Sequence, residues 1–255
     1  MPGAGSERRA LLSGFAGACR RRRGLACVQP HGEACARLRP VSDPAPSFAG
    51  DRGTARYYDM RAAEYDDWYV GAGAFAERER PGWQRELARL TELVSGLAPA
   101  RTLDIACGTG FLTRHLRGFA VGVDQSSAMV AIAQSRLPHG LAVVGDALAV
   151  GMADLAFDRV FTAHFYGHLP PPERSAFLAE ARRLAPQLVV VDSAMRAGVA
   201  PEGWQRRVLD DGSEHRVYKR YLSASQLAQE IGGSVLLDGD WFVAAEATAA
   251  GPPPP

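Results

Sequence analysis

Three aspartates follow three short apolar runs, in the order Asp104, Asp124 and Asp146. The first lies in Leu103-Asp-Ile-Ala-Cys-Gly-Thr-Gly110, where the glycines let a ligand approach the backbone closely. Asp124, twenty residues later, is placed to accept hydrogen bonds from both hydroxyls of a ribose. Asp146 can accept from the exocyclic amine of an adenine. Each could cap a helix by itself, but their order and spacing favour a site for a nucleoside.

Dinucleotide-binding proteins also have a glycine turn after a strand, and two residues argue against that alternative. The dinucleotide fingerprint requires glycine at position 113, where this chain has Thr113. The Asp104 carboxylate would repel a pyrophosphate, which dinucleotide folds seat on a helix N-terminus. A carboxylate there suits instead a ligand with an ammonium group and a sulfonium. A nicotinamide-dependent oxidoreductase therefore stays as a less favoured alternative.

Apolar runs and helical patterns alternate along most of the chain. Strands are predicted at 101–105, 119–124, 141–145, 158–162 and 188–192, and helices between them at 110–117, 126–136 and 172–185. Upstream, aromatic residues at helical spacing predict a helix over 54–70, and a second helix carries Trp83, Leu87, Leu90, Val94 and Leu97 on one face. A helix at 224–231 and strands near 234–238 and 241–247 close the pattern. Since this alternation requires crossover helices, we expect a doubly wound α/β sheet.

Composition limits the class of protein. The 255 residues include 29 basic and 28 acidic side chains, and no apolar run approaches the roughly 18 residues of a membrane span. An integral membrane protein is therefore excluded. Residues 1–50 hold eight arginines against three acidic residues, a net charge of +5, which leaves −4 for residues 51–255. Because the larger part lacks a basic footprint, no nucleic-acid partner is expected.

The motifs together resemble those of class I S-adenosylmethionine-dependent methyltransferases of the small-molecule type. Residues 103–110 match the first motif, 121–124 the second and 145–147 the third, while 157–161 and 164–169 match the fourth strand and its loop. The resemblance covers roughly residues 55–247. It implies a doubly wound, seven-stranded Rossmann-like methyltransferase sheet with an antiparallel last strand, and S-adenosylmethionine as cofactor, with no metal. The expected domain spans residues 51–248.

The resemblance also implies which residues bind the cofactor. Asp104, Gly108 and Gly110 would hold the methionine end, Asp124 and Gln125 the ribose, and Asp146 with Ala147 the adenine, with Met129 over an adenine face. Tyr57, Arg61 and Tyr65 belong to an N-terminal helix with which relatives close the site. Ala106, which replaces the first glycine of the motif, and Ala163 complete the set.

The segment His164-Phe-Tyr-Gly-His168 supplies the candidate catalytic groups. By the resemblance it faces the reacting methyl group, where a general base can take a proton from the acceptor. His168 aligns with a histidine that many relatives keep, and a hydrogen bond at a helix end explains it equally well. His164 stands where relatives often have an apolar residue, which makes it the sharper catalytic hypothesis.

The predicted acceptor is an unidentified small molecule. Residues 194–221 are expected to form part of its binding wall, with basic groups that either bind an acidic substrate or are solvated. The fourth strand is not followed by an Asn-Pro-Pro-Tyr-like tetrapeptide, which argues against amino methylation of nucleic acid. The other alternative is a non-catalytic or regulatory protein that binds S-adenosylmethionine with a retained methyltransferase fold.

The two ends of the chain differ from the domain between them. Residues 1–50 are expected to form a disordered basic leader, and 249–255 a disordered proline-rich tail, because proline cannot continue a strand or helix. The leader matches a secretory signal poorly, although its arginine-rich composition also fits an organelle transit peptide. A cytoplasmic protein is expected, and the oligomeric state is left open.

Overall fold

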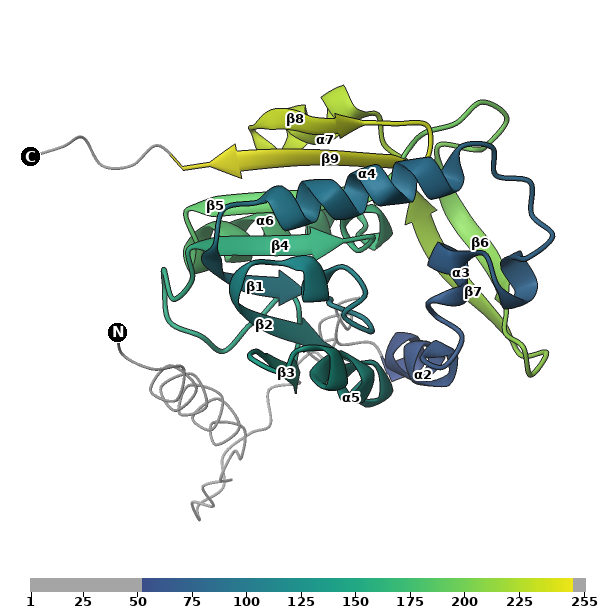
Figure 1. Cartoon of the computed structure of the whole chain (residues 1–255), viewed down its shortest axis with the longest axis horizontal. Helices are drawn as coiled ribbons and strands as arrows, with labels where there is room; N and C mark the ends of the chain where they lie inside the picture. The colour runs from purple at the N-terminus through teal and green to yellow at the C-terminus, as the bar shows by residue number, and fades with distance from the viewer. Residues whose placement is uncertain (1–51, 250–255) are drawn as a thin grey trace, which may run out of the picture.

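The computed structural model describes residues 52–249 (Figure 1). The predicted leader and all but one residue of the predicted tail lie outside the described residues, so those expectations stay predictions. Within 52–249, none of the helices combines the length and the apolar character that crossing a membrane would require.

A seven-stranded sheet forms the centre of the molecule, in the order β3-β2-β1-β4-β5-β9-β8. Its strands are β1 Ala100–Ile105, β2 Gly118–Asp124, β3 Leu141–Val144, β4 Arg159–Ala163, β5 Gln187–Ser193, β8 Ser234–Asp238 and β9 Phe242–Thr248. The first five are parallel, with Leu103 of β1 opposite Val121 of β2 and Val160 of β4. Strand β9 runs antiparallel to both β5 and β8. The predicted doubly wound sheet with a reversed last strand is confirmed.

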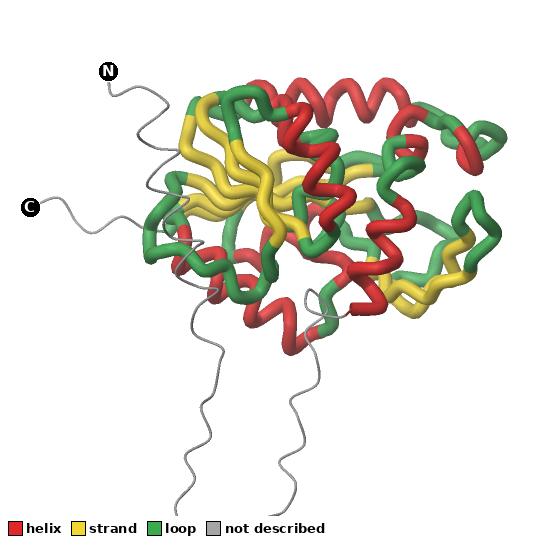
Figure 2. The backbone as a smooth tube through the Cα atoms, turned by 90° about the horizontal axis from the view of Figure 1, so that it is seen from below, coloured by secondary structure: helices red, strands yellow, loops and turns green. Residues whose placement is uncertain are grey.

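Helices cover both faces of this sheet, which explains why its strands read as continuous apolar runs (Figure 2). Helix α4, Trp83–Gly96, packs with Phe161 and Val191 on one face. Helices α6, Pro171–Leu184, and α7, Ala224–Ile231, pack on the other face with Val160 and Val190. Successive strand residues thus enter opposite cores, as the two-residue period of a strand requires. Helix α5, Ser127–Arg136, lies beside β2 and β3.

The prediction of one helix over 54–70 is wrong. The structure has helix α2, Arg52–Arg61, then a turn, and then the short helix α3, Asp67–Val70. The turn brings Asp66 to the Thr109 hydroxyl at 2.6 Å and to the Arg136 guanidinium at 2.5 Å. These tertiary contacts override the local helical pattern, because intrinsic propensity is only a weak preference.

The predicted helix over 110–117 is also wrong, since this segment holds only the 3₁₀ turn η3, Thr113–His115. Strand β2 begins at Gly118, and Leu116 is already extended, so no second helical turn fits. A helix this short gains too few hydrogen bonds to offset its nucleation. The Thr113 hydroxyl instead donates to Asp104 at 2.5 Å and fixes the segment against β1.

Residues 194–221, for which no regular element was predicted, contain a β-hairpin of β6, Glu202–Val208, and β7, Glu214–Arg220. This hairpin is a separate two-stranded sheet. Figure 1 places it with α2 and α3 beyond the carboxyl ends of the parallel strands. Ligands of open α/β sheets bind at that end, so the hairpin and the N-terminal helices border the candidate site.

Candidate active site

The glycine loop leaves β1 through three residues with left-handed backbone conformations. Ala106 has φ of 59°, Gly108 of 54° and Gly110 of 72°. A Cβ atom at Gly108 would lie 3.4 Å from the Tyr65 ring, and one at Gly110 would lie 3.2 Å from Cα of Ala133 in α5. Glycine is therefore needed at 110 for packing against α5 and is favoured at 108 by its backbone conformation. Ala106 adopts a left-handed conformation that is unfavourable for an L-residue.

Asp104 lies at the end of β1 with 2% of its surface exposed. Its Oδ2 atom accepts the Thr113 hydroxyl hydrogen bond, whereas Oδ1 is buried and has no partner among residues 52–249. Burial raises the pKa of the Asp104 carboxyl to about 8. A buried acceptor without a donor is costly, so this atom suits a ligand that brings a hydrogen-bond donor or a positive charge.

Asp124, at the end of β2, holds the glycine loop in place. Its Oδ2 accepts from the Gly108 backbone N–H and its Oδ1 from the Ser126 N–H, each at 2.9 Å. Burial raises the pKa of the Asp124 carboxyl to about 6 despite these donors. The neighbouring Gln125 has its Oε1 buried without a partner in the described part of the chain. Two buried acceptors without a partner among residues 52–249, Asp104 Oδ1 and Gln125 Oε1, thus belong to the strand ends that carry the glycine loop.

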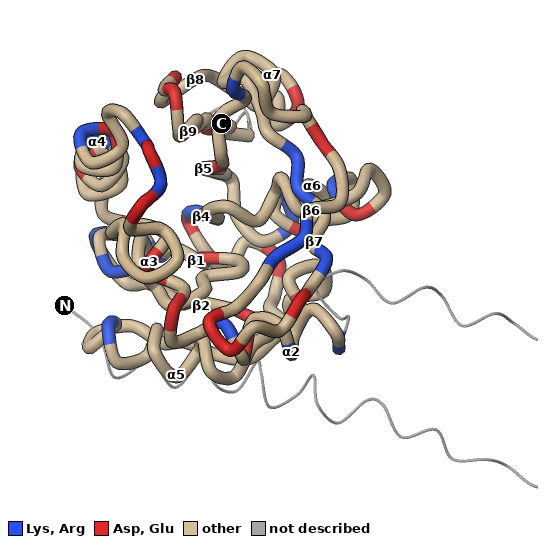
Figure 3. The backbone as a smooth tube through the Cα atoms, turned by 90° about the vertical axis from the view of Figure 1, so that its right-hand side faces the viewer, with Lys and Arg blue, Asp and Glu red and all other residues tan. Residues whose placement is uncertain are grey.

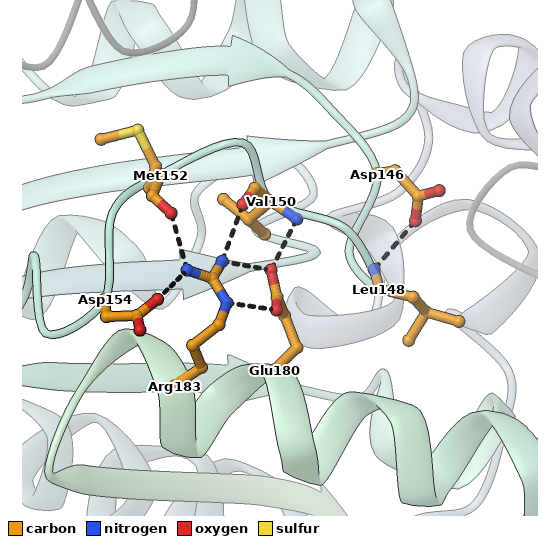
Figure 4. A network of polar contacts seen from close by, with 7 residues as sticks. All are labelled: Asp146, Leu148, Val150, Met152, Asp154, Glu180 and Arg183. Carbon is orange, nitrogen blue, oxygen red and sulfur yellow. Dashed lines mark hydrogen bonds and ion pairs between the residues drawn. The ribbon is translucent and has the colours of Figure 1, made fainter. Parts of the chain in front are cut away.

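The loop after β3 carries Asp146 and is tied to helix α6 (Figure 4). Asp146 accepts a hydrogen bond from the Leu148 N–H at 2.8 Å, which fixes the start of the loop. Arg183 of α6 donates to the carbonyls of Met152 and Val150, at 2.7 and 3.0 Å. Glu180, one turn earlier on α6, accepts from the Val150 N–H at 2.8 Å. Arg183 and Glu180 therefore position a segment that sequence reasoning had left without a support.

A small cavity of about 40 Å³ lies among these loops. It is lined by Tyr58, Tyr65, Ala106, Gly108, Asp124, Gln125, Gly145, Ala147, Ala163, His164 and Phe165. Seven of the thirteen residues predicted to bind the cofactor are thus brought together. Tyr57 and Arg61 instead line a second, larger cavity. Asp104, Gly110, Met129 and Asp146 line neither, and Met129 is buried with 1% of its surface exposed.

Two aspartates that sequence reasoning missed fasten the N-terminal segment over the site. Asp59 of α2 accepts from the Ser126 hydroxyl at 2.6 Å and from the Ala128 N–H at 3.1 Å, at the start of α5. Asp66 binds Thr109 and Arg136, as described above. The Tyr65 ring is held between the glycine loop and the Arg61 guanidinium, whose Cζ lies 5.0 Å from its centroid. Only the helical spacing of the tyrosines signalled this segment in the sequence.

His164, just after β4, stands between the two cavities and lines both. Its backbone is left-handed, with φ of 58°, and its N–H donates to the Val191 carbonyl at 2.9 Å. Its ring lies 4.7 Å from Trp68 and 5.7 Å from Phe242, measured between centroids. Both ring nitrogens are buried without a partner in the part of the chain that is described. Burial lowers the pKa of His164 to about 3, so the imidazole is neutral.

His168 is held in one orientation, because its Nδ1 donates to the Tyr218 carbonyl at 2.6 Å. Burial lowers its pKa well below the ordinary value, with Lys219 acting in the same direction. His168 lines the larger cavity only. The structure therefore brings both predicted histidines to the site, and of the two histidines only His164 lines both cavities.

A buried ion pair lies beside the histidines. Lys219 Nζ is 2.6 Å from Asp192 Oδ1, with 5% and 0% of the two side chains exposed. Asp192 also accepts from the N–H groups of Gly167 and Ser193, each at 2.7 Å. Burial alone would raise the pKa of Asp192, but the charge and hydrogen bond of Lys219 outweigh burial and lower it. Lys219 is the only lysine of the chain, but no motif of the sequence pointed to its pairing with Asp192.

The larger cavity measures about 710 Å³, which is within the range of small-molecule sites. Its walls come from α2, α3, the segment before α4, and the β6–β7 hairpin, as predicted for 194–221. Its basic lining residues are Arg61, Arg78, Arg80, Arg196, Arg206, Arg207 and Lys219, against Glu64, Asp67, Glu79 and Asp210. Figure 3 shows the basic segments of the hairpin at this end of the molecule. Basic side chains thus outnumber acidic ones in the lining, and two of them, Lys219 and Arg206, are paired with carboxylates that lie outside it.

Proteins of known family or structure are similar to this chain in sequence and in fold. Residues 102–187 match the family model of a methyltransferase domain. Over 101 residues the chain is 37% identical to a demethylmenaquinone methyltransferase of Thermotoga maritima, a match that covers 38% of this chain and 43% of that protein. The match thus spans less than half the length of that relative.

Two solved structures are similar over most of the chain. The DhpI–SAH complex has a TM-score of 0.58 and 26% identity, and covers 76% of this chain and 95% of that one. The DhpI–SAM–HEP complex has a TM-score of 0.60 and 25% identity, and covers 77% and 98%. The stretch that matches the family model runs from β1 to the start of β5 and includes both the glycine loop and His164. The chain is thus similar in fold, and over residues 102–187 in sequence, to S-adenosylmethionine-dependent methyltransferases.

Proposed function

We propose that this protein transfers the methyl group of S-adenosylmethionine to a small molecule that binds in the larger cavity. The observation that carries the proposal is the junction of the two cavities, where His164, Tyr58 and Tyr65 line both. One cavity is bordered by the glycine loop and the strand-end acids, and the other has the volume of a small-molecule site. Donor and acceptor would therefore meet at His164.

The residues present fit the cofactor. When bound, S-adenosylmethionine supplies an electrophilic methyl group on a sulfonium. The buried Oδ1 of Asp104 is suited to the ammonium group of its methionine end. Asp124 and Gln125 offer acceptors for the ribose hydroxyls, and Gly145 with Ala147 form the wall for the adenine. The SAM- and SAH-bound DhpI structures support this assignment.

The small cavity must enlarge to take a nucleoside, because about 40 Å³ is far below the several hundred Å³ of ordinary ligand sites. Tyr58 and Tyr65 are the cavity-lining residues that come from the N-terminal segment rather than from the sheet loops. We propose that this segment moves outward to admit the cofactor and then closes over it through Asp59 and Asp66.

His164 is the proposed general base. It is neutral at physiological pH and both ring nitrogens lack partners among the described residues, so one nitrogen has a lone pair that can take up a proton from the acceptor. A base with so low a pKa gives a small driving force for proton transfer, and we expect its contribution to be modest. Positioning of the two reactants in adjoining cavities supplies the larger part of the acceleration. His168, bound to Tyr218, orients the acceptor wall.

The test is formation of S-adenosylhomocysteine by the purified full chain, given S-adenosylmethionine and a panel of small hydroxyl, amine and carboxylate compounds. We expect product above the acceptor-free control with one chemical group of acceptors. If the protein binds S-adenosylmethionine but forms no S-adenosylhomocysteine with any acceptor, the regulatory alternative replaces methyl transfer. Tight binding of NAD(P) without S-adenosylmethionine binding would instead support the oxidoreductase.

A further inference from the structure

Two cationic groups of the larger cavity lie near the same aromatic ring, that of Tyr221. Lys219 Nζ lies 6.0 Å from the centroid of Tyr221, and Arg196 Cζ lies 5.5 Å from the same centroid. All three residues line the cavity. Lys219 comes from β7, Arg196 from the loop after β5, and Tyr221 directly follows β7. Segments from both sides of the hairpin thus place two positive charges on one part of the wall.

The Lys219 ammonium retains hydrogen-bonding capacity beyond its ion pair. An ammonium has three N–H donors, and one of them is used by Asp192. No other hydrogen-bond acceptor for Nζ is found within residues 52–249. Asp192 is fully buried behind the lysine and already accepts from two backbone N–H groups, so it holds the ammonium at the cavity wall rather than facing the cavity itself.

Arg196 is a second cation with spare donors. Its guanidinium Cζ lies 4.3 Å from the Trp241 centroid, so the group is near two aromatic rings, those of Trp241 and Tyr221. Its Nε is buried with no hydrogen-bond partner, and within the described part of the chain the guanidinium forms no ion pair with a carboxylate. A guanidinium presents a flat fork of N–H groups that matches an oxyanion.

We propose that the methyl acceptor carries an oxyanion, a carboxylate or a phosphoryl group, which Lys219 and Arg196 bind beside Tyr221. This inference rests on the function proposed above and names the substrate class of the same site. A buried ion pair alone contributes little to stability compared with apolar residues of similar volume. Binding of an anion would explain why the Lys219 ammonium is buried at the cavity wall. It also agrees with the excess of basic over acidic side chains in the lining of the larger cavity.

The test is calorimetric titration of the full chain with benzoate and phenyl phosphate, each with and without S-adenosylhomocysteine, and with benzamide as the uncharged analogue. Arg196→Gln removes one cation. The double variant Lys219→Met/Asp192→Asn removes the other without leaving Asp192 as an unpaired buried charge. Arg101→Gln is the matched control, because it also removes an arginine from an ion pair. Its partner is Asp158, and the pair lies at the amino ends of the parallel strands, away from the cavity.

We expect at least one of the two anions to bind about tenfold or more tightly than benzamide, and each cavity variant to lose about tenfold in affinity, as for a lost charge-assisted hydrogen bond. Arg101→Gln should bind like the wild type. The preference between benzoate and phenyl phosphate identifies the oxyanion. Equal binding of benzamide, no binding of either anion, or unchanged affinity in both cavity variants would overturn the inference. Because S-adenosylhomocysteine is titrated separately, failure of anion binding is distinguished from failure of the proposed function.

Discussion

At the scale of single residues, the two aspartates that end β1 and β2 have different surroundings and therefore different roles. Asp124 uses both carboxylate oxygens on backbone N–H groups, so it shapes the glycine loop as well as facing the small cavity. Asp104 keeps one buried oxygen without a partner among residues 52–249. A carboxyl in that state is protonated at neutral pH, since its pKa is raised to about 8.

This raised pKa predicts proton release when the cofactor binds. An ammonium group beside Asp104 favours the carboxylate, so the carboxyl should lose its proton at pH 7. Calorimetry of S-adenosylmethionine binding in buffers of different ionisation enthalpy should therefore report release of a proton, and Asp104→Asn should abolish the release. An equal release in wild type and variant would mean that the proton comes from another group.

The same carboxyl gives a pH dependence of stability with a defined sign. Between pH 3.8, the ordinary pKa of an aspartate carboxyl, and about pH 8, the folded chain holds a proton that the unfolded chain has lost. The free energy of unfolding contributed by Asp104 is present below pH 3.8 and falls as the pH rises towards 8. Asp104→Asn should flatten this part of the profile, measured by urea unfolding without cofactor. An unchanged profile would contradict the burial of this group.

The role of His164 is tested by His164→Gln. We expect kcat to fall about tenfold to a hundredfold, a modest loss for a general base, with the cofactor dissociation constant unchanged. Because the pKa of His164 is about 3, kcat should show no histidine titration near pH 6.5. His168→Gln serves as comparison and should affect acceptor KM more than kcat. Unchanged turnover in His164→Gln removes it as the base.

At the scale of elements, the site depends on loops that are tied to neighbouring helices. Arg183 and Glu180 attach the loop after β3 to α6 (Figure 4). Asp59 and Asp66 attach the N-terminal segment to α5 and the glycine loop. In the proposed function, the first attachment would position the adenine wall and the second would lie over the ribose. Neither follows from periodicity, because both join residues far apart in the chain.

Loss of Arg183 should weaken cofactor binding without touching the cavity. A charge-assisted hydrogen bond contributes about 1.5–3 kcal/mol, so in Arg183→Gln we expect the cofactor dissociation constant to rise roughly tenfold. At saturating cofactor, kcat should be close to that of the wild type. Arg182→Gln, on the same helix but outside this network, is the control. Equal affinities of the two variants would show that the loop needs no such attachment.

Hydrogen exchange tests the N-terminal segment. If Tyr58 and Tyr65 must move outward for the cofactor, the segment 52–70 samples open states and its amides exchange quickly without ligand. Addition of S-adenosylhomocysteine should slow exchange there more than in α6, which packs in the core. Protection that is the same with and without ligand would mean that the cofactor enters by another route.

At the scale of the whole molecule, the predicted elements agree with the structure where a local sequence pattern determines them. They differ where contacts between distant residues determine the structure. The five parallel strands and helix α7 could be predicted because strands buried on both faces and amphipathic helices leave strong periodic signals. The three acids at strand ends could be placed together because parallel strands share one carboxyl edge. The break after Arg61, the single turn at 113–115 and the hairpin could not, because tertiary contacts and cross-strand pairing decide them.

The candidate site divides in the same way. Gly108, Asp124 and Ala147 were predicted from motifs and line the small cavity. The Lys219–Asp192 pair could not be predicted, because it joins β7 to β5 across a hairpin that no motif indicated. Motifs thus predicted the residues at the carboxyl edge of the sheet, whereas for 194–221 they predicted neither the hairpin nor the ion pair.

The most direct test of the account is calorimetric titration of the full chain with S-adenosylhomocysteine, compared with NAD. We expect saturable binding of S-adenosylhomocysteine and no binding of NAD. In Asp124→Ala the affinity for S-adenosylhomocysteine should fall by about tenfold or more through loss of ribose hydrogen bonds. The variant should still unfold cooperatively on heating. Absence of S-adenosylhomocysteine binding in the wild type, or wild-type affinity in a folded Asp124→Ala variant, would contradict it.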